Sequence, residues 1–72
     1  MKLINEIIKK YPQVIFEYKV EKIKGYPLPF HTLYVGDSPI VSIMEEHEPK
    51  TGMEKNSLME IVNHNVKLHL PY

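Results

Sequence analysis

The sequence predicts an α+β domain: a three-stranded antiparallel sheet with two helices on one face, in the order α-β-β-β-α. Apolar residues recur at helical spacing near each end of the chain. Between these ends, three short runs of alternating or β-rich residues are separated by turns that contain glycine and proline. The first run has one polar face, which leaves a single dry face of the sheet for both helices to cover. A chain of 72 residues has room for one domain, residues 1–72.

The first helix is predicted over about three turns at the start of the chain. Its apolar positions follow the spacing i, i+1, i+4, i+5 and i+8, and are Leu3, Ile4, Ile7, Ile8 and Tyr11. Polar and charged residues occupy the opposite face. Pro12 ends the helix because a residue before proline disfavours helical geometry.

Residues 14–23 predict the first strand. Val14, Phe16, Tyr18 and Val20 point one way, and Glu17, Lys19 and Glu21 point the other. We expect Tyr11, Phe16 and Tyr18 to belong to the core. Residues 30–35 and 40–44 predict the second and third strands. The turn sequence at residues 36–39 is short enough to join them as an antiparallel hairpin.

The second helix is predicted at residues 53–64. Two overlapping capping boxes precede or begin it, one from Thr51 to Glu54 and one from Ser57 to Glu60. Its apolar stripe is Leu58, Ile61 and Val62. Residues 66–70 alternate between apolar and polar, which indicates either a fourth strand or an extended strap.

Composition limits the classes of function. The absence of cysteine excludes disulfides and cysteine-based zinc sites, and it is in keeping with a reducing, cytoplasmic setting. No apolar run approaches the roughly 20 residues of a membrane span, and the charged start of the chain does not predict a signal peptide. The absence of arginine, alanine and tryptophan is typical of an AT-rich genome such as that of a virus, a phage or a low-GC bacterium.

Charge is balanced overall but not along the chain. Nine lysines match nine acidic residues, so there is no general basic signature of nucleic-acid binding. Residues 1–35 have a net charge of +3 and residues 36–72 a net charge of −3. The asymmetry is consistent with chance, with two oppositely charged faces, or with a self-complementary dimer.

The chain resembles the double-stranded-RNA-binding domain over residues 3–64. The element order agrees, and so do the start of the first helix around Glu6, the first strand followed by Gly25 and a proline, and the position of Lys55 near the second helix. The resemblance implies nucleic-acid contacts from Glu6, Lys9, Lys10, His31, Lys50 and Lys55. Two features depart from the family: residues 50–55 lack the middle lysines of its phosphate-binding cluster, and the loop at 45–48 is acidic.

No arrangement of residues points to catalysis. Glu60 and His64 are four apart, and His47 lies within an acidic run, but neither has a recognised metal-ligand spacing. There is no glycine-rich phosphate loop, and Ser38 and Ser57 have simpler roles in a turn and a cap. We therefore expect no catalytic residue, no metal and no cofactor.

The aromatic residues suggest a binding surface instead. Tyr26, Leu28 and Phe30 occupy a proline-rich loop, where tyrosine is a common anchor of protein interfaces. Tyr34 is expected to share the outer face of the sheet with Lys19, an arrangement that can also stack bases. The leading hypothesis is a small non-enzymatic protein that regulates or inhibits a protein partner by stoichiometric association, or that associates with itself as a homodimer. A double-stranded-RNA-binding module is the alternative, and a small metal-dependent enzyme is the third.

Overall fold

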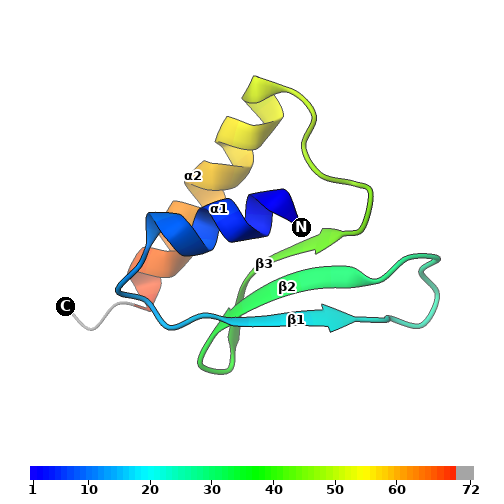
Figure 1. Ribbon diagram of the computed structural model, residues 1–72, viewed down its shortest axis with the longest axis horizontal. Coiled ribbons are helices and arrows are strands. Elements are labelled where there is room, and N and C mark those ends of the chain that lie inside the picture. Colours follow the sequence, from blue (N-terminus) through cyan, green and yellow to red (C-terminus); the bar gives the residue numbers. More distant parts are fainter. Residues whose placement is uncertain (70–72) are drawn as a thin grey trace.

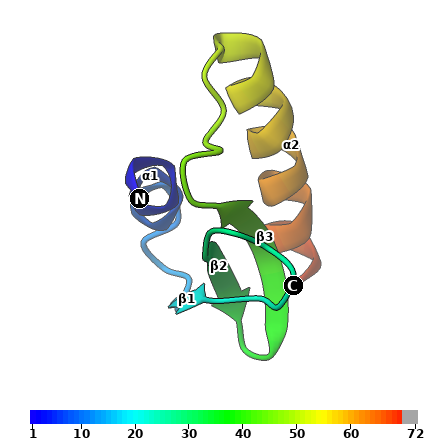
Figure 2. The same cartoon turned by 90° about the vertical axis from the view of Figure 1, so that its right-hand side faces the viewer.

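The computed structural model describes residues 1–69, which fold in the predicted order α-β-β-β-α (Figure 1). The elements are α1 (Lys2–Lys10), β1 (Glu17–Glu21), β2 (Phe30–Val35), β3 (Ser38–Met44) and α2 (Gly52–Leu68). The strands form an antiparallel sheet in the order β1-β2-β3. Both helices lie on one side of it (Figures 1 and 2). The predicted fold class is confirmed.

The core lies between the two helices and the inner face of the sheet. Its buried apolar residues are Leu3, Ile4 and Ile7 of α1, Leu33 of β2, Ile40, Val41 and Ile43 of β3, and Val62 and Val66 of α2. Ile4, Ile7, Leu33 and Val62 have no exposed surface. The helix that the spacing predicts at the start of the chain is confirmed, and it ends at Lys10, two residues before Pro12.

The hairpin of β2 and β3 turns at Gly36 and Asp37. Gly36 has φ of +62°, a left-handed conformation that glycine adopts without strain. The register shifts between Leu33 and Tyr34, which pair with Val41 and Pro39, so Ile40 is an extra residue on β3. Pro39 has no N–H to donate, which suits a bulge on an edge strand. The bulge leaves Ile40 buried.

Strand β1 is shorter than the predicted 14–23. It begins at Glu17, which pairs with Tyr34, and ends at Glu21, which pairs with Phe30. The hairpin turn follows Val35 on the partner strand, so residues 14–16 have little opposite them. At the other end, two prolines precede Phe30 and cannot donate to a ladder.

The expected fourth strand or strap at residues 66–70 is wrong for residues 66–68. These residues are the last turn of α2, and Leu70 lies outside the described residues. Val66 is 1% exposed and stands one helical turn after Val62. Asn63 accepts a hydrogen bond from the Tyr11 hydroxyl. Asn65 donates to the carbonyl of Ile40, so both asparagines hold α2 against the rest of the fold.

One of the two predicted capping boxes forms. Thr51 is the N-cap of α2, and its hydroxyl oxygen accepts from the N–H of Glu54 at 3.1 Å. The Glu54 carboxylate accepts from the N–H of Lys50, one residue before the cap, also at 3.1 Å. Ser57 lies inside the helix and caps nothing.

Candidate functional site

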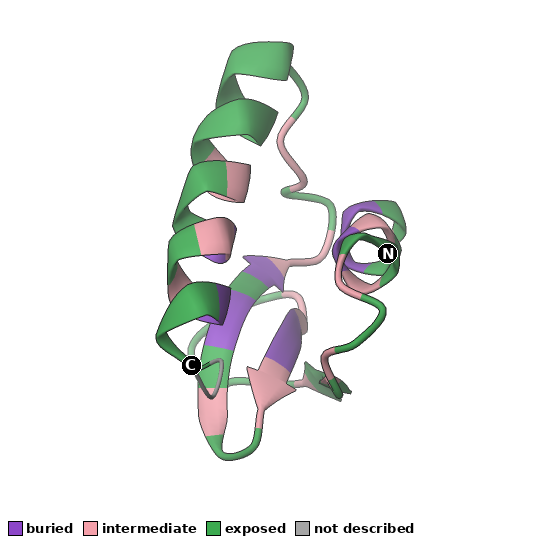
Figure 3. Ribbon diagram, turned by 90° about the vertical axis from the view of Figure 1, so that its left-hand side faces the viewer, coloured by how far each residue is buried: buried purple, intermediate pink, exposed green. Residues whose placement is uncertain are grey.

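Strand β1 is the most exposed part of the sheet. It is an edge strand, and none of its five residues is buried (Figure 3). Tyr18 and Val20, which lie on the helix-facing side, are 36% and 59% exposed. Strand β1 and its flanks carry five exposed large apolar residues, which together we call the β1 surface: Ile15, Tyr18, Val20, Ile23 and Tyr26.

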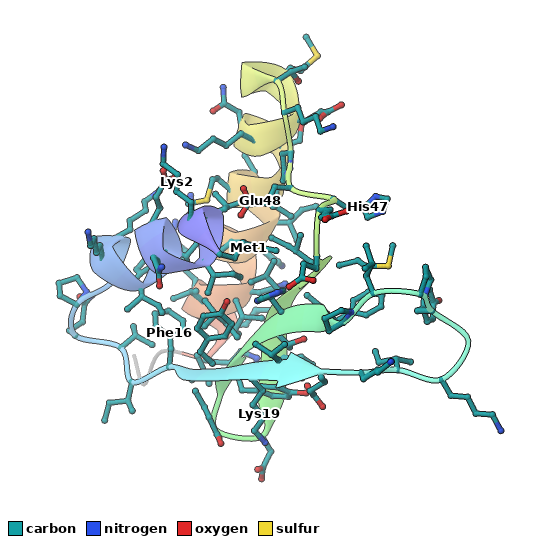
Figure 4. All side chains as sticks on the ribbon, turned by 45° about the vertical axis from the view of Figure 1, so that its right-hand side comes forward. Met1, Lys2, Phe16, Lys19, His47 and Glu48 are labelled. Carbon is teal, nitrogen blue, oxygen red and sulfur yellow. The ribbon has the colours of Figure 1, made fainter. Side chains whose placement is uncertain are left out.

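The exposure of β1 follows from where the helices pack. The buried residues of the sheet all belong to β2 and β3, and α2 packs on β3. Helix α1 is only nine residues long, and its buried side chains point into the core between the helices. Phe16, which precedes β1, is half-buried against this core and points toward the helices in Figure 4. The expectation that Tyr18 belongs to the core is therefore wrong, because the strand that carries it lies at the margin of the covered face.

The outer face of the sheet carries a small polar cluster. Lys19 points away from the helices (Figure 4), and its Nζ lies 5.0 Å from the centre of the Tyr34 ring. The Tyr34 hydroxyl donates to Glu21 at 2.7 Å, and Lys19 lies 3.6 Å from Glu17. The hydrogen bond to Glu21, with some loss of solvent, raises the pKa of Tyr34. Tyr34 and Lys19 thus share a face as predicted, but two carboxylates accompany them.

The proline-rich loop between β1 and β2 presents one aromatic side chain to solvent. Tyr26 is 50% exposed and packs edge-on against Phe30, with ring centres 5.0 Å apart. Leu28 and Phe30 are half-buried. Phe30 also pairs with Glu21 on β1 and Met44 on β3. Of the four predicted partner-binding residues, Tyr26 is therefore the one most available to a partner.

A hydrogen-bonded chain links Tyr18, His31 and Glu45 on the inner face. His31 is 9% exposed; its Nδ1 lies 2.6 Å from the Tyr18 hydroxyl and its Nε2 lies 3.2 Å from the Glu45 carboxylate. Because a carboxylate only accepts, Nε2 donates to Glu45, and in the neutral form of the ring Nδ1 accepts from the Tyr18 hydroxyl. Burial raises the pKa of Tyr18, and the charges of Glu48 and Glu45 raise it further.

His31 and Glu45, two members of this hydrogen-bonded series, line a pocket of about 440 Å³. Its lining residues are Met1, His31, Glu45, Glu46, Glu48, Pro49 and Lys50, of which Met1 and Glu48 are labelled in Figure 4. Three glutamates against one lysine make the lining acidic. The pocket is unsuited to phosphate, and within residues 1–69 no group of three histidine or acidic side chains is placed to hold a metal ion.

The predicted nucleic-acid contacts do not form one basic surface. Glu6 and Lys55 pair with each other at 2.8 Å across the two helices, and this contact with Lys55 holds the pKa of Glu6 below its ordinary value. Lys9 and Lys10 lie in the last turn of α1, and the Nζ of Lys10 is 5.8 Å from the centre of the Tyr11 ring. The remaining two candidates line the acidic pocket: Lys50 at its rim and His31 within the sheet.

Comparisons with known proteins leave the chain without a match: no family model, no curated protein and no solved structure is similar to it at a significant level. The described part of the chain contains no helix long and apolar enough to cross a membrane.

Sequence reasoning missed Ile15, Val20 and Ile23 as candidate binding residues. Alternation correctly placed Val20 on the helix-facing side, but alternation does not report whether a helix covers that part of the sheet. The order of the elements did indicate that β1 is an exposed edge strand. Two short connections make a β1-β2-β3 meander, in which β1 is an edge, and lysines at 22 and 24 flank it in the way that edge strands are often protected.

Proposed function

We propose that this chain is a small non-enzymatic binding protein that regulates or inhibits a protein partner by stoichiometric association through the β1 surface. One observation supports it above the others. Among residues 1–69, five of the eight exposed large apolar side chains lie within residues 15–26. Isolated apolar residues are normal on a protein surface, but Tyr18 and Val20 are exposed on the same face of an edge strand, where a pairing strand would cover them.

The mode of binding that suits this surface is strand addition. An edge strand offers backbone N–H and C=O groups that lack a partner on one side, and an extended segment can bind them. The alternating side chains then supply specificity. On the inner side a partner strand would meet Tyr18 and Val20, and beyond the strand end it would meet Ile23 and Tyr26, whose apolar surface is otherwise left in water.

The experiment is affinity capture of the tagged chain from a lysate of the cells that produce it, with two variants beside the wild type. Val20→Lys places a charge in the β1 surface. Met53→Lys is the matched control, because Met53 is 81% exposed at the far end of the fold, in the first turn of α2. Both variants should fold, since neither side chain is in the core.

We expect a stoichiometric protein partner with the wild type and with Met53→Lys, and its loss with Val20→Lys. Equal capture by all three proteins would show that the partner binds elsewhere and would overturn the proposal. A cytoplasmic setting suits this function, in keeping with a chain that contains no cysteine.

A double-stranded-RNA-binding module is the second candidate, because the order α-β-β-β-α is the one that the family resemblance implies. Against it, Glu6 and Lys55 neutralise each other and the loop after β3 is acidic. We expect weak binding to duplex RNA that falls steeply with salt. Tight binding at physiological salt, lost in Lys9→Glu and unaffected in Val20→Lys, would place this candidate first.

A further inference from the structure

We propose that β1 pairs with β1 of a second copy of this chain, antiparallel, about a two-fold axis that passes through Tyr18. The two sheets would then form one continuous sheet of six strands with all four helices on the same face. This inference names a partner for the β1 surface and therefore rests on the proposed function.

The edge is open for such pairing. Strand β1 hydrogen-bonds β2 on one side only, and no other strand within residues 1–69 approaches its free side. It is neither covered by a helix nor interrupted by proline, which are two common ways of protecting an edge. Two identical antiparallel strands can pair around a two-fold axis perpendicular to the sheet, and such an axis passes through one residue and its copy.

The charges of the outer face favour the register centred on Tyr18. In that register Glu17 of each copy lies directly opposite Lys19 of the other, so the interface contains two pairs of opposite charge. Both side chains are about half exposed in the single chain and reach the edge from the same face. Opposite charges in directly facing positions stabilise a strand pair, whereas like charges destabilise it.

The apolar residues of the inner face favour the same register. Phe16 of each copy lies opposite Val20 of the other, and the two Tyr18 side chains face each other. Aromatic residues facing β-branched or aromatic residues are favourable cross-strand pairs. The pairing would cover Val20, whose side chain is 59% exposed in the single chain, and Tyr18, which is 36% exposed.

Neighbouring registers lose one of these two advantages. Centring the axis on Lys19 sets the two lysines against each other and Glu17 against Glu21. Centring it on Val20 restores a pairing of Lys19 with Glu21 but places both aromatic side chains of the inner face opposite lysines. Only the register through Tyr18 combines opposite charges outside with apolar pairs inside.

The test is a charge exchange between two variants. Glu17→Lys sets lysine against lysine twice in the homodimer, and Lys19→Glu sets glutamate against glutamate twice. We expect each variant to self-associate roughly tenfold more weakly than the wild type in sedimentation equilibrium from micromolar to millimolar concentration. An equimolar mixture of the two variants should form a heterodimer at least as stable as the wild-type homodimer, because each lysine then faces a glutamate.

The mixture separates pairing between chains from effects within one chain. Each variant loses its own contact between residues 17 and 19, which measures 3.6 Å in the wild type, and mixing cannot restore that contact. Glu21→Lys is the control. By itself Glu21→Lys should associate as strongly as the wild type, since position 21 faces Ile15 in the proposed register. Its heterodimer with Lys19→Glu should be weaker than that homodimer, because one of the two charge pairs then sets glutamate against glutamate. Rescue by Glu21→Lys instead of Glu17→Lys would overturn the register in favour of the one centred on Val20.

Disulfide trapping provides a second reading, because the chain has no cysteine of its own. A Tyr18→Cys variant should crosslink rapidly to itself under mild oxidation, since facing Cα atoms on paired strands are close enough for a disulfide. Lys19→Cys should crosslink slowly. A wild type that stays monomeric to millimolar concentration, with no crosslink at position 18, would refute self-pairing. Capture of another protein that Val20→Lys abolishes would in that case leave the proposed function standing.

Discussion

Replacing Val66 tests whether the end of α2 belongs to the core. Val66 is 1% exposed, and changing it to alanine removes two carbon atoms that the rest of the core cannot replace. At about 0.8 kcal/mol for each buried methylene-sized group, the transfer loss is about 1.6 kcal/mol, and the cavity that remains adds to it. Alanine is the better helix former by about 0.5 kcal/mol. We expect Val66→Ala to lower the free energy of unfolding by about 2 kcal/mol.

The matched control is Leu68→Ala, two residues further along the same helix. Leu68 is 66% exposed, so its truncation should cost about 0.5 kcal/mol or less. Urea denaturation followed by circular dichroism at one low protein concentration measures both, and keeps any self-association out of the comparison. If residues 66–68 formed an exposed strap or edge strand, the two substitutions would cost similarly little. A loss below 0.5 kcal/mol for Val66→Ala would therefore refute the packing described for α2.

Three further outcomes are expected. Thr51→Ala should cost about 0.5–2 kcal/mol of unfolding free energy in the same assay, whereas Ser57→Ala should cost nothing measurable, because only Thr51 caps α2. The pKa of Tyr34 is raised above 10.0, so its contribution to stability is present below pH 10 and is lost as pH rises through the folded-state pKa. Because the pKa of Tyr18 is raised as well, ultraviolet titration should show two late-ionising tyrosines in the wild type, of which one is absent in Tyr34→Phe and is shifted downward in Glu21→Leu. The pKa of Glu6 is lowered below 4.5, so the wild type should be more stable than Glu6→Gln at neutral pH. This difference in stability should vanish as pH falls through the folded-state pKa. A difference that persists in stronger acid would mean that the ion pair is not its cause.

The fold was readable from the sequence because local patterns and tertiary packing agree over most of the chain. Leu3, Ile4 and Ile7 recur at helical spacing and all three are buried. The turn at Gly36 has the chemistry of a hairpin and forms one. Where the patterns misled, the deciding contacts were distant in sequence. Residues 66–68 alternate like a strand, but Val66 also follows Val62 at helical spacing, so a helix can bury both. The hydrogen bond from Asn65 to the Ile40 carbonyl could not be predicted from local propensity.

The candidate site could be predicted less well from the sequence, because it depends on which part of the sheet the helices leave uncovered. The alternation of residues 14–23 gives each side chain a face, but burial depends on the length and placement of the helices above it. Tyr18 and Val20 were therefore placed on the correct face, but Tyr18 was wrongly expected to belong to the core. Tyr26 was identified because proline restricts its loop and favours an outward side chain. The contact of Glu6 with Lys55 joins the two helices, and only the assembled fold could reveal that it neutralises two of the predicted RNA-binding residues.

Amide hydrogen exchange is the most direct test that β1 is the binding surface. Exchange would be compared between the free chain at low concentration and the chain in its complex, whether with a captured partner or with a second copy at high concentration. Strand addition predicts slower exchange in the bound state at the outward-facing amides of Glu17–Glu21, and unchanged exchange in the first turn of α2 around Met53. Unchanged exchange throughout β1 in a complex that is demonstrably formed would contradict the account.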